Sequence, residues 1–301
     1  MDIRNTDGLQ FLSGIPDESV DLVLTDPPYI TSRDSGMDKW VDHVAECDAE
    51  GGNVCSEDDW KKLKNPVEWA HFFKSDKKFL KVKTKEEKRD YIRKAWKRMR
   101  ENYLKYGSIY GKKYAVRTNY GKWDSEFTME DLQLFINHFY RVLKPGGTCI
   151  VFFDLWKITP LKDQLESAKF KQIRFIEWLK TNPQPINSKV NYLTNCREIA
   201  LLGIKKSKPT FNSSYDKAVY EYPIQGGKDR FHPTQKNTEL FKELILKHSN
   251  EGDVVLDPFL GSGTTAVAAN DTGRQFIGCE LDKEYYEKAT ARILQTKGTT
   301  K

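Results

Sequence analysis

The sequence predicts an α/β fold: a doubly wound, mostly parallel sheet with a helical basic insertion. Short runs rich in Val, Leu and Ile, typical of buried parallel strands, recur along the chain and alternate with amphipathic helix patterns in its second half. A glycine-rich segment near residue 260 joins one such strand to a helix. Between Lys61 and Lys122 the chain carries 21 Lys and Arg against 6 Asp and Glu, which points to a polyanionic partner.

Composition narrows the class of protein. The 301 residues are enough for one large domain plus an insertion, and 31% of them are charged. No apolar run approaches the length that spans a bilayer, and the N-terminus lacks a signal-peptide pattern, so we expect no membrane association. The five cysteines are scattered and odd in number, which indicates a reducing compartment. The spacing of His43, Cys47, Cys55 and His71 matches no zinc pattern, so we expect no metal.

The first strand is predicted at Val20–Leu24, after a brief helix at Leu9–Leu12. It ends at Asp26, where Pro27 and Pro28 fix the backbone and remove two donors before Tyr29. A carboxylate and an aromatic ring are thereby held at the carboxyl end of a strand, the edge where open α/β sheets bind ligands.

Residues 30–122 are predicted as an inserted basic helical segment. Its first part, residues 30–60, reads as a polar loop, and Asn65-Pro66 is a helix start. Thr84 has capping-box spacing to Glu87 and opens a long helix through Tyr106. One face of this helix is apolar and aromatic and is expected to pack rather than to stack on bases. We expect the basic residues to follow DNA phosphates: Lys88, Arg89, Arg93, Lys94, Lys97, Arg98, Arg100, Lys112, Lys113 and Arg117.

The α/β pattern returns after the insertion. A capping box at Thr128 begins a helix that the Lys144–Gly147 turn ends. Strands are predicted at 148–153, 173–179 and 199–204, and residues 205–231 are an irregular segment that we expect to share in target recognition. A helix is predicted from Thr238 to His248.

A strand at Asp253–Leu256 runs into the loop Asp257-Pro258-Phe259-Leu260-Gly261-Ser262-Gly263-Thr264-Thr265 and then into a helix. Glycines allow close backbone approach, and the amides at the helix start suit a ligand carboxylate. The next strand, Gln275–Cys279, ends in Glu280, which stands where an acidic residue can hold ribose hydroxyls. A final helix begins near Lys283.

The Asp26-Pro27-Pro28-Tyr29 turn resembles the Asp-Pro-Pro-Tyr signature of DNA methyltransferases that modify exocyclic amino groups. The 257–265 loop is similar to the methionine-binding loop of S-adenosylmethionine enzymes. His232-Pro233-Thr234-Gln235-Lys236 resembles the family's His-Pro-Thr-Gln-Lys-Pro box, with Asn237 in place of the last Pro. With the catalytic turn first and the cofactor loop last, the order resembles the beta group, a permuted form of the Rossmann-like methyltransferase fold.

This resemblance implies that residues 1–29 and 123–301 form the catalytic domain and bind S-adenosyl-L-methionine. It assigns Asp26, Pro27, Pro28 and Tyr29 to catalysis. It assigns cofactor contacts to Asp7, Asp26, His232, Thr234, Lys236, Asp257, Phe259, Gly261, Ser262, Gly263, Thr264, Thr265 and Glu280. For Asp7 the family has a preceding Gly where this chain has Thr6, and a turn aspartate before Gly8 explains it equally well.

The expected reaction is methylation of the N6 amino group of a flipped adenine in double-stranded DNA, with acceptors at Asp26 and at the Pro27 carbonyl. A carboxylate of ordinary pKa is a weak base, which favours electrostatic stabilisation over proton abstraction. An N4-cytosine enzyme and an RNA adenine methyltransferase are the alternatives. The resemblance also suggests a restriction endonuclease and a homodimer as partners, and a cytoplasmic protein of prokaryotic or viral origin.

Overall fold

The structure is a computed structural model, which describes residues 1–30, 36–63, 79–114, 127–183, 195–227, 230–232 and 234–297. Two compact units make up the chain. Unit 1 comprises Met1–Ile30 and Tyr120–Lys301, and unit 2 comprises Thr31–Asn119. Unit 2 therefore covers nearly the same residues as the insertion expected at 30–122.

Unit 1 is built on an eight-stranded sheet with the order β1-β8-β7-β2-β3-β5-β4-β6. Its strands are β1 (Asp2–Asn5), β2 (Val20–Thr25), β3 (Leu143–Phe153), β4 (Lys171–Lys180), β5 (Arg197–Ile204), β6 (Val219–Tyr222), β7 (Val254–Asp257) and β8 (Gln275–Glu280). The first five strands in this order, which are β1, β8, β7, β2 and β3, pair in parallel. Strand β5 is antiparallel to both of its neighbours, β3 and β4. The antiparallel β5 thus reverses direction inside a mostly parallel sheet.

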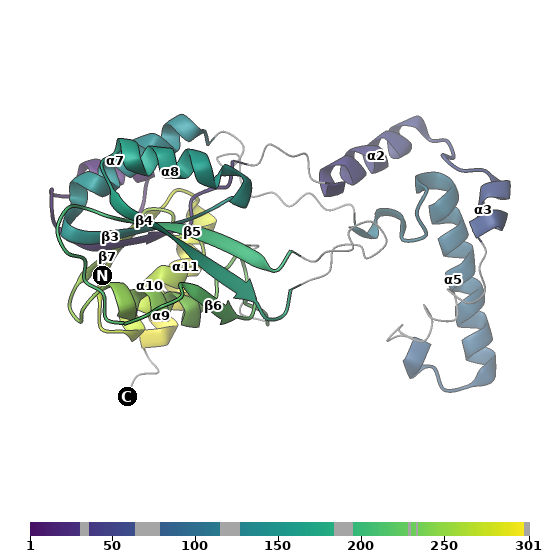
Figure 1. The fold of residues 1–301 in the computed structure, drawn as a ribbon. Helices are drawn as coiled ribbons and strands as arrows, with labels where there is room; N and C mark the ends of the chain where they lie inside the picture. Colours follow the sequence, from purple (N-terminus) through teal and green to yellow (C-terminus); the bar gives the residue numbers. More distant parts are fainter. Residues whose placement is uncertain are drawn as a thin grey trace. The chain divides into compact units, whose positions relative to one another are not determined.

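Helices cover both faces of this sheet, as the doubly wound prediction requires (Figure 1). On one face lie α1 (Gly8–Ser13), α7 (Met129–Val142) and α8 (Ile158–Ser167). On the other lie α9 (Thr238–His248), α10 (Thr264–Asp271) and α11 (Lys283–Lys297). The predicted fold class is therefore confirmed.

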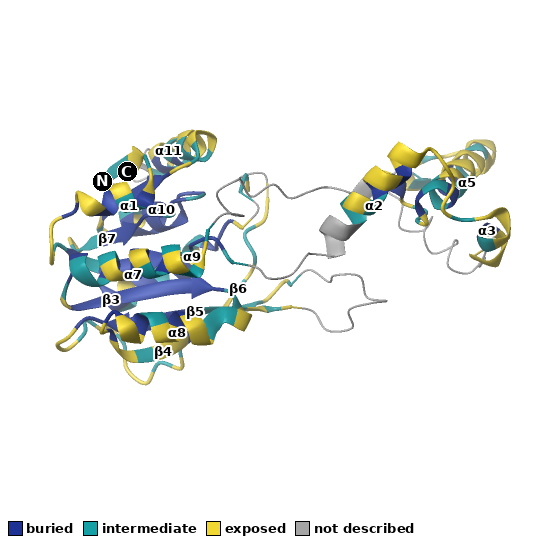
Figure 2. Cartoon of the chain, turned by 90° about the horizontal axis from the view of Figure 1, so that it is seen from above, coloured by how far each residue is buried: buried dark blue, intermediate teal, exposed yellow. Residues whose placement is uncertain are grey.

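Strand β2 lies inside the sheet and is buried on both sides. Leu22 and Leu24 enter the core shared with α9 and α10, and Val23 enters the core shared with α1 and α7. All three side chains are fully buried. Figure 2 shows the same burial along β3, the neighbour of β2. Two apolar cores thus fix the position at which β2 ends, and with it the position of Asp26.

Unit 2 is helical, with α2 (Gly36–Glu50), α3 (Glu57–Leu63) and α5 (Lys85–Tyr106), and with short 3-10 turns at Phe79–Lys81 and Gly111–Tyr114. Thr84 and Glu87 form the predicted capping box at the start of α5. Trp96 and Met99 of α5 pack against Trp60 of α3. The aromatic face of α5 therefore packs internally, as predicted.

Several expectations were wrong. Residues 30–60 are not simply a loop, because α2 and α3 lie there: Val44 and Cys47, three residues apart, pack on Tyr106 and give α2 a narrow apolar face. The polar segment 205–231 contains β6. Strand β3 begins at Leu143 rather than at residue 148. Strand β1 and helix α8 were not anticipated, and the predicted helix start at Asn65-Pro66 lies outside the described residues.

None of the described helices has both the length and the apolar character that crossing a bilayer requires.

Replacing a core aromatic tests the packing of α9 on the sheet. Phe241 of α9 stacks on Phe152 of β3 with ring centroids 5.4 Å apart. Because Phe241→Ala leaves a cavity, we expect it to lower the free energy of unfolding by about 3–5 kcal/mol, measured by urea denaturation. Leu246→Ala on the same helix is the control, since Leu246 is 47% exposed. A similar loss from both variants would contradict this packing.

Candidate active site

Both sequence motifs lie at one edge of the sheet. Strands β2 and β7 are parallel neighbours that end at Thr25 and Asp257, so the segments that follow leave the sheet at the same edge. The Thr25 hydroxyl donates a hydrogen bond of 2.7 Å to Asp257 Oδ1. The structure therefore brings together the two segments that the sequence placed 232 residues apart.

The Asp26–Tyr29 turn is held by its own neighbours. Pro27 and Pro28 are buried, and the ring of Tyr29 packs edge-on against Phe153 at 5.9 Å. The side chain of Asp26 is 18% exposed, and its Oδ2 accepts from Lys236 Nζ at 2.9 Å. Among the described residues, Asp26 Oδ1 has no hydrogen-bond partner although it is buried. The turn thus offers one carboxylate oxygen that can accept a hydrogen bond from a ligand.

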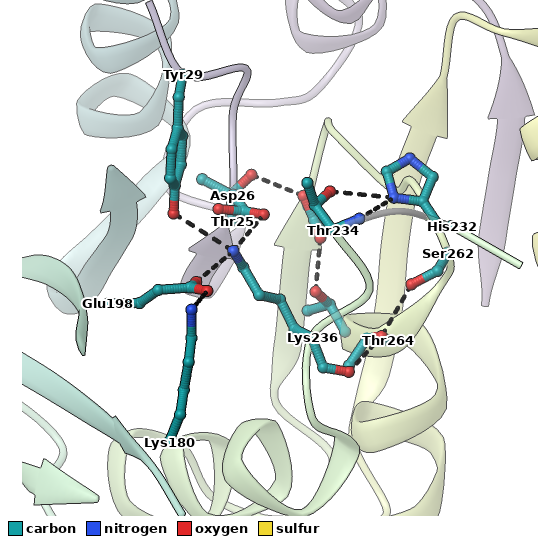
Figure 3. Close-up of polar contacts among 12 residues, drawn as sticks. Thr25, Asp26, Tyr29, Lys180, Glu198, His232, Thr234, Lys236, Ser262 and Thr264 are labelled. Atoms are coloured by element: carbon teal, nitrogen blue, oxygen red, sulfur yellow. Dashed lines mark hydrogen bonds and ion pairs between the residues drawn. The ribbon is translucent and has the colours of Figure 1, made fainter. Parts of the chain in front are cut away.

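Lys236 occupies the centre of this cluster, with its side chain only 7% exposed. Besides Asp26, its Nζ contacts Glu198 Oε2 at 2.7 Å and the Tyr29 hydroxyl at 3.3 Å. Glu198 is bound in turn by Lys180, at 2.8 Å. Figure 3 shows Asp26, Glu198 and Tyr29 meeting at the Lys236 ammonium, with Lys180 joined to Glu198. The lysine expected to contact the cofactor therefore points its charge at the predicted catalytic carboxylate.

Strand direction explains why Glu198 and Lys180 reach this site. Glu198 lies at the start of β5, which is antiparallel to β3, so the start of β5 stands at the edge where β3 ends. Lys180 is the last residue of β4, which is antiparallel to β5 and ends at that same edge. The sequence predicted a role for neither residue, because no local pattern gives the direction of β5.

The charges of this cluster shift the pKa values of its members. Burial raises the pKa of Asp26 to about 6, assisted by the negative charge of Glu198 and opposed by Lys236. Burial alone would lower the pKa of Lys236, but Asp26 and Glu198 hold it well above its usual range. Burial acts to raise the pKa of Glu198, but Lys236 and Lys180 lower it. The premise of an ordinary pKa for Asp26 was therefore wrong.

The glycine loop has the features of a site for S-adenosylmethionine. Gly261 and Gly263 have φ values of +51° and +76°, which side chains rarely tolerate. Gly263 caps α10 without a side-chain hydrogen bond to the first-turn amides, which leaves room for a ligand carboxylate. Glu280 accepts from the Gly261 amide at 2.7 Å and from the Asp282 amide at 2.9 Å. A carboxylate has about four acceptor positions, so Glu280 retains acceptors for ribose hydroxyls.

Two predicted cofactor residues of this loop point inward instead. Asp257 accepts from Thr25, from the Thr265 hydroxyl at 2.6 Å and from the Phe259 amide at 3.0 Å. The side chain of Phe259 packs on Phe135 with centroids 4.5 Å apart. These side chains fasten the loop to β2, α10 and α7.

The remaining predicted residues lie in the loop or beside it. His232 stacks edge-on against Tyr285 at 4.4 Å, and its Nδ1 lies 3.1 Å from the Thr234 hydroxyl. Burial lowers the pKa of His232 to about 4, so the ring is neutral at pH 7. The hydroxyls of Ser262 and Thr264 lie 3.0 Å apart. Arg292 of α11, which the sequence did not single out, donates to the Ser262 carbonyl at 2.9 Å.

Asp7 stands at the same edge as Glu280, because β1 pairs with β8 and the Thr6 amide bonds the Glu280 carbonyl. Its carboxylate caps α1 by accepting from the Gln10 amide at 2.9 Å. One oxygen of Asp7 thus has a structural partner, and its role toward a ligand stays a prediction.

The predicted DNA-contacting residues lie in unit 2, most of them on α5. Arg89, Arg93, Lys97 and Arg98 are exposed, and no ion pair to another described residue involves them. Others are engaged: Lys94 pairs with Asp90, Arg100 with Glu57 and Lys112 with Asp48. Lys88 is exposed and lies over the Phe79 ring. The side chain of Lys113 and all of Arg117 lie outside the described residues.

Comparison with known proteins agrees with this geometry. The DNA methylase family model for N6 and N4 amino-methyltransferases matches residues 20–291. The chain belongs to this family. It is 35% identical over 197 residues to the Type II methyltransferase M2.DpnII of Streptococcus pneumoniae, covering 59% of this chain and 73% of that protein. To the Type II methyltransferase M2.LlaDCHI of Lactococcus lactis subsp. cremoris it is 35% identical over 204 residues, covering 62% and 75%.

One similar solved structure is a complex with S-adenosylmethionine. The M1.HpyAVI–SAM complex matches with a TM-score of 0.50 and 34% identity, over 55% of this chain and 82% of that one. The family confirms that the chain is a DNA methyltransferase and that S-adenosylmethionine is its methyl donor. The predicted family, enzyme class and cofactor are thus confirmed.

Removing the Thr265 hydroxyl tests whether the hydrogen bonds to Asp257 stabilise the fold. Thr265→Val removes one donor from a buried carboxylate, so we expect a loss of about 1–3 kcal/mol in the free energy of unfolding, measured by urea denaturation. Thr290→Val is the matched control, because the Thr290 hydroxyl is buried without a hydrogen-bond partner among the described residues. It should leave stability unchanged or raise it. Equal losses from the two variants would argue against the anchor.

Proposed function

We propose that this methyltransferase transfers the methyl group to the N6 amino nitrogen of an adenine flipped out of duplex DNA, and that Asp26 receives the amino group. The observation that carries the proposal is the Oδ1 of Asp26 at the carboxyl edge of the sheet, which is buried without a hydrogen-bond partner among the residues that the structure describes. A buried acceptor without a partner costs free energy, which a donor on the substrate would recover.

The amino nitrogen of adenine is a poor nucleophile, because its lone pair is delocalised into the ring. An acceptor aimed at an amino hydrogen favours a pyramidal nitrogen with an available lone pair and stabilises the positive charge that develops there. Asp26 Oδ1 supplies one such acceptor, and the Pro27 carbonyl is the second that we expect. When bound, S-adenosylmethionine supplies a methyl group already activated by its sulfonium.

Asp26 also receives the proton in this proposal. As the new nitrogen–carbon bond forms and the carbon–sulfur bond breaks, one amino hydrogen becomes acidic and passes to the carboxylate. A pKa raised to about 6 supports this step, because a more basic carboxylate takes the proton more readily while still ionised at pH 7. The raised pKa therefore favours proton transfer more than the sequence led us to expect.

Base flipping is required because the amino nitrogen cannot be reached inside a duplex. The ring of Tyr29 is fixed against Phe153 and next to Asp26, where it can stack on the extruded base. Such stacking contributes about 1–3 kcal/mol per base in related settings. Adenine is favoured over cytosine because the turn has Asp where the family's N4-cytosine form has Ser.

Unit 2 is proposed to contact the DNA backbone through the basic face of α5. Arg89, Arg93 and Lys97 recur every four residues, so they share one side of the helix, and all three are exposed. A row of charges on one face suits the spaced phosphates of a duplex. The proposed target-recognition role of residues 30–122 rests on this argument, whereas that of residues 205–231 stays a prediction. The restriction endonuclease and the homodimer stay predictions.

Replacing the proposed acceptor tests the reaction. We expect Asp26→Asn to lower the methylation rate on unmethylated plasmid DNA about 100- to 1,000-fold, while binding of S-adenosylmethionine changes only a few fold. Asp216→Asn is the matched control, since Asp216 also pairs with a lysine, Lys247, at 2.6 Å, but precedes β6, which three strands separate from β2. Substantial activity in Asp26→Asn would contradict the role of Asp26.

The same reaction identifies the base. Mass spectrometry of nucleosides from the methylated plasmid should show N6-methyladenine. N4-methylcytosine would instead make this an N4-cytosine enzyme, and faster methylation of structured RNA than of DNA would overturn the duplex substrate.

Reversing the exposed charges of α5 tests the DNA surface. The triple variant Arg89→Glu, Arg93→Glu and Lys97→Glu should weaken DNA binding and reduce the slope of log K against log salt by about 3. The matched control reverses the charges of Lys169, Lys171 and Lys206. These exposed residues lie in unit 1, at the start of β4 and the end of β5, which is the edge of the sheet opposite to Asp26. An unchanged slope in the α5 variant would remove α5 from the interface.

A further inference from the structure

The Lys236 ammonium has no hydrogen-bonding capacity left for a ligand. An ammonium has three N–H donors. Lys236 Nζ lies 2.9 Å from Asp26 Oδ2, 2.7 Å from Glu198 Oε2 and 3.3 Å from the Tyr29 hydroxyl. These three acceptors take its three donors, so the side chain contacts a substrate or cofactor only if one of these bonds breaks.

The same lysine joins the two halves of the site. Its backbone carbonyl lies 3.4 Å from the Thr264 hydroxyl, at the first turn of α10 behind the glycine loop. Its side chain reaches the turn after β2 (Figure 3). Glu198 also pairs with the ammonium and is itself paired with Lys180. The series Lys180–Glu198–Lys236–Asp26 therefore alternates in charge, from β4 and β5 through the segment before α9 to the turn after β2.

We propose that Lys236 and Glu198 are positioning residues that fix Asp26 through its Oδ2, so that Oδ1 alone faces the amino group of the target base. Glu198 shares the lysine and keeps Lys236 from neutralising Asp26 completely, which preserves the strength of Oδ1 as an acceptor. Lys180 balances the charge of Glu198. The inference rests on the proposed function, because it needs Asp26 to receive the base.

The two positioning residues act on Asp26 with opposite signs. The groups that face Asp26 or its partners are Lys236 before α9, Glu198 on β5, Lys180 on β4 and Tyr29 on the turn. Removing the positive charge of Lys236 makes Asp26 harder to ionise, whereas removing the negative charge of Glu198 makes it easier. A role confined to packing would not move the pH dependence in opposite directions.

The test is the pH profile of kcat/KM for methylation of unmethylated plasmid DNA by the full chain. The wild-type rate should fall as pH drops through about 6, because protonated Asp26 cannot accept at both oxygens. We expect this acid limb to move to higher pH in Lys236→Met and to lower pH in Glu198→Gln. Lys236→Met should also lose about 100-fold in kcat/KM at pH 7, because Oδ1 is no longer held in place.

Lys247→Met on α9 is the matched control. Lys247 also pairs with two carboxylates, Asp216 and Glu243, at 2.6 and 2.5 Å, and it makes no contact with Asp26. Its acid limb should coincide with that of the wild type. Binding of S-adenosylmethionine, measured by calorimetry, verifies that each variant is folded.

Acid limbs that stay in place, or that move in the same direction, would overturn the positioning roles. If Lys236→Met does not fold, Glu198→Gln decides alone: a limb at lower pH supports the proposal and an unchanged limb rejects it. The Asp26→Asn variant distinguishes a failure of the positioning roles from a failure of the proposed function. If it is inactive while the other limbs stay in place, only the positioning roles fail. If it retains activity with the wild-type limb, the proposed function itself fails.

Discussion

The candidate active site depends on the ion pairs of the buried Lys236 ammonium. A lysine with a side chain 7% exposed must be paired, because an isolated buried charge is very costly. Its partners come from the turn after β2 and from the start of β5, so pairing the charge also brings these segments together. The result is an Asp26 carboxylate with one oxygen held and one oxygen unpartnered among the described residues.

The sheet places Asp26 where it can pair with Lys236. Two apolar cores bury β2 from both faces and fix where it ends. The hydrogen bond from Thr25 to Asp257 then sets the end of β2 against the end of β7, where the glycine loop begins. The same Asp257 accepts from Thr265 in the first turn of α10. One buried carboxylate thus connects the two segments that resemble a methyl-acceptor turn and a methyl-donor loop.

The order of the elements gives the site two separately built halves. Glu280, Gly261 and Gly263 form one half from β8 and the loop before α10, and Asp26 and Tyr29 form the other from the turn after β2. Lys236 contacts both, through its backbone carbonyl near Thr264 and through its side chain at Asp26. A DNA methylase needs a methyl donor and an amino acceptor in line, and the proposed function assigns one half of the candidate site to each.

The sequence by itself determined six of the eight strands of the sheet, the proline turn, the glycine loop and the basic helix, because each is a local pattern of residue types. It missed the strands β1 and β6 and the helices α2, α3 and α8; in α2 and β1 few apolar residues mark the element. Only the tertiary structure decided that Glu198 and Lys180 stand beside Asp26, that Asp257 turns inward and that the Lys236 side chain faces the acceptor turn. The physical reason is strand direction: the antiparallel pairing of β5 brings its first residues to the edge where β2 and β3 end, and no neighbouring residues in the chain encode that choice.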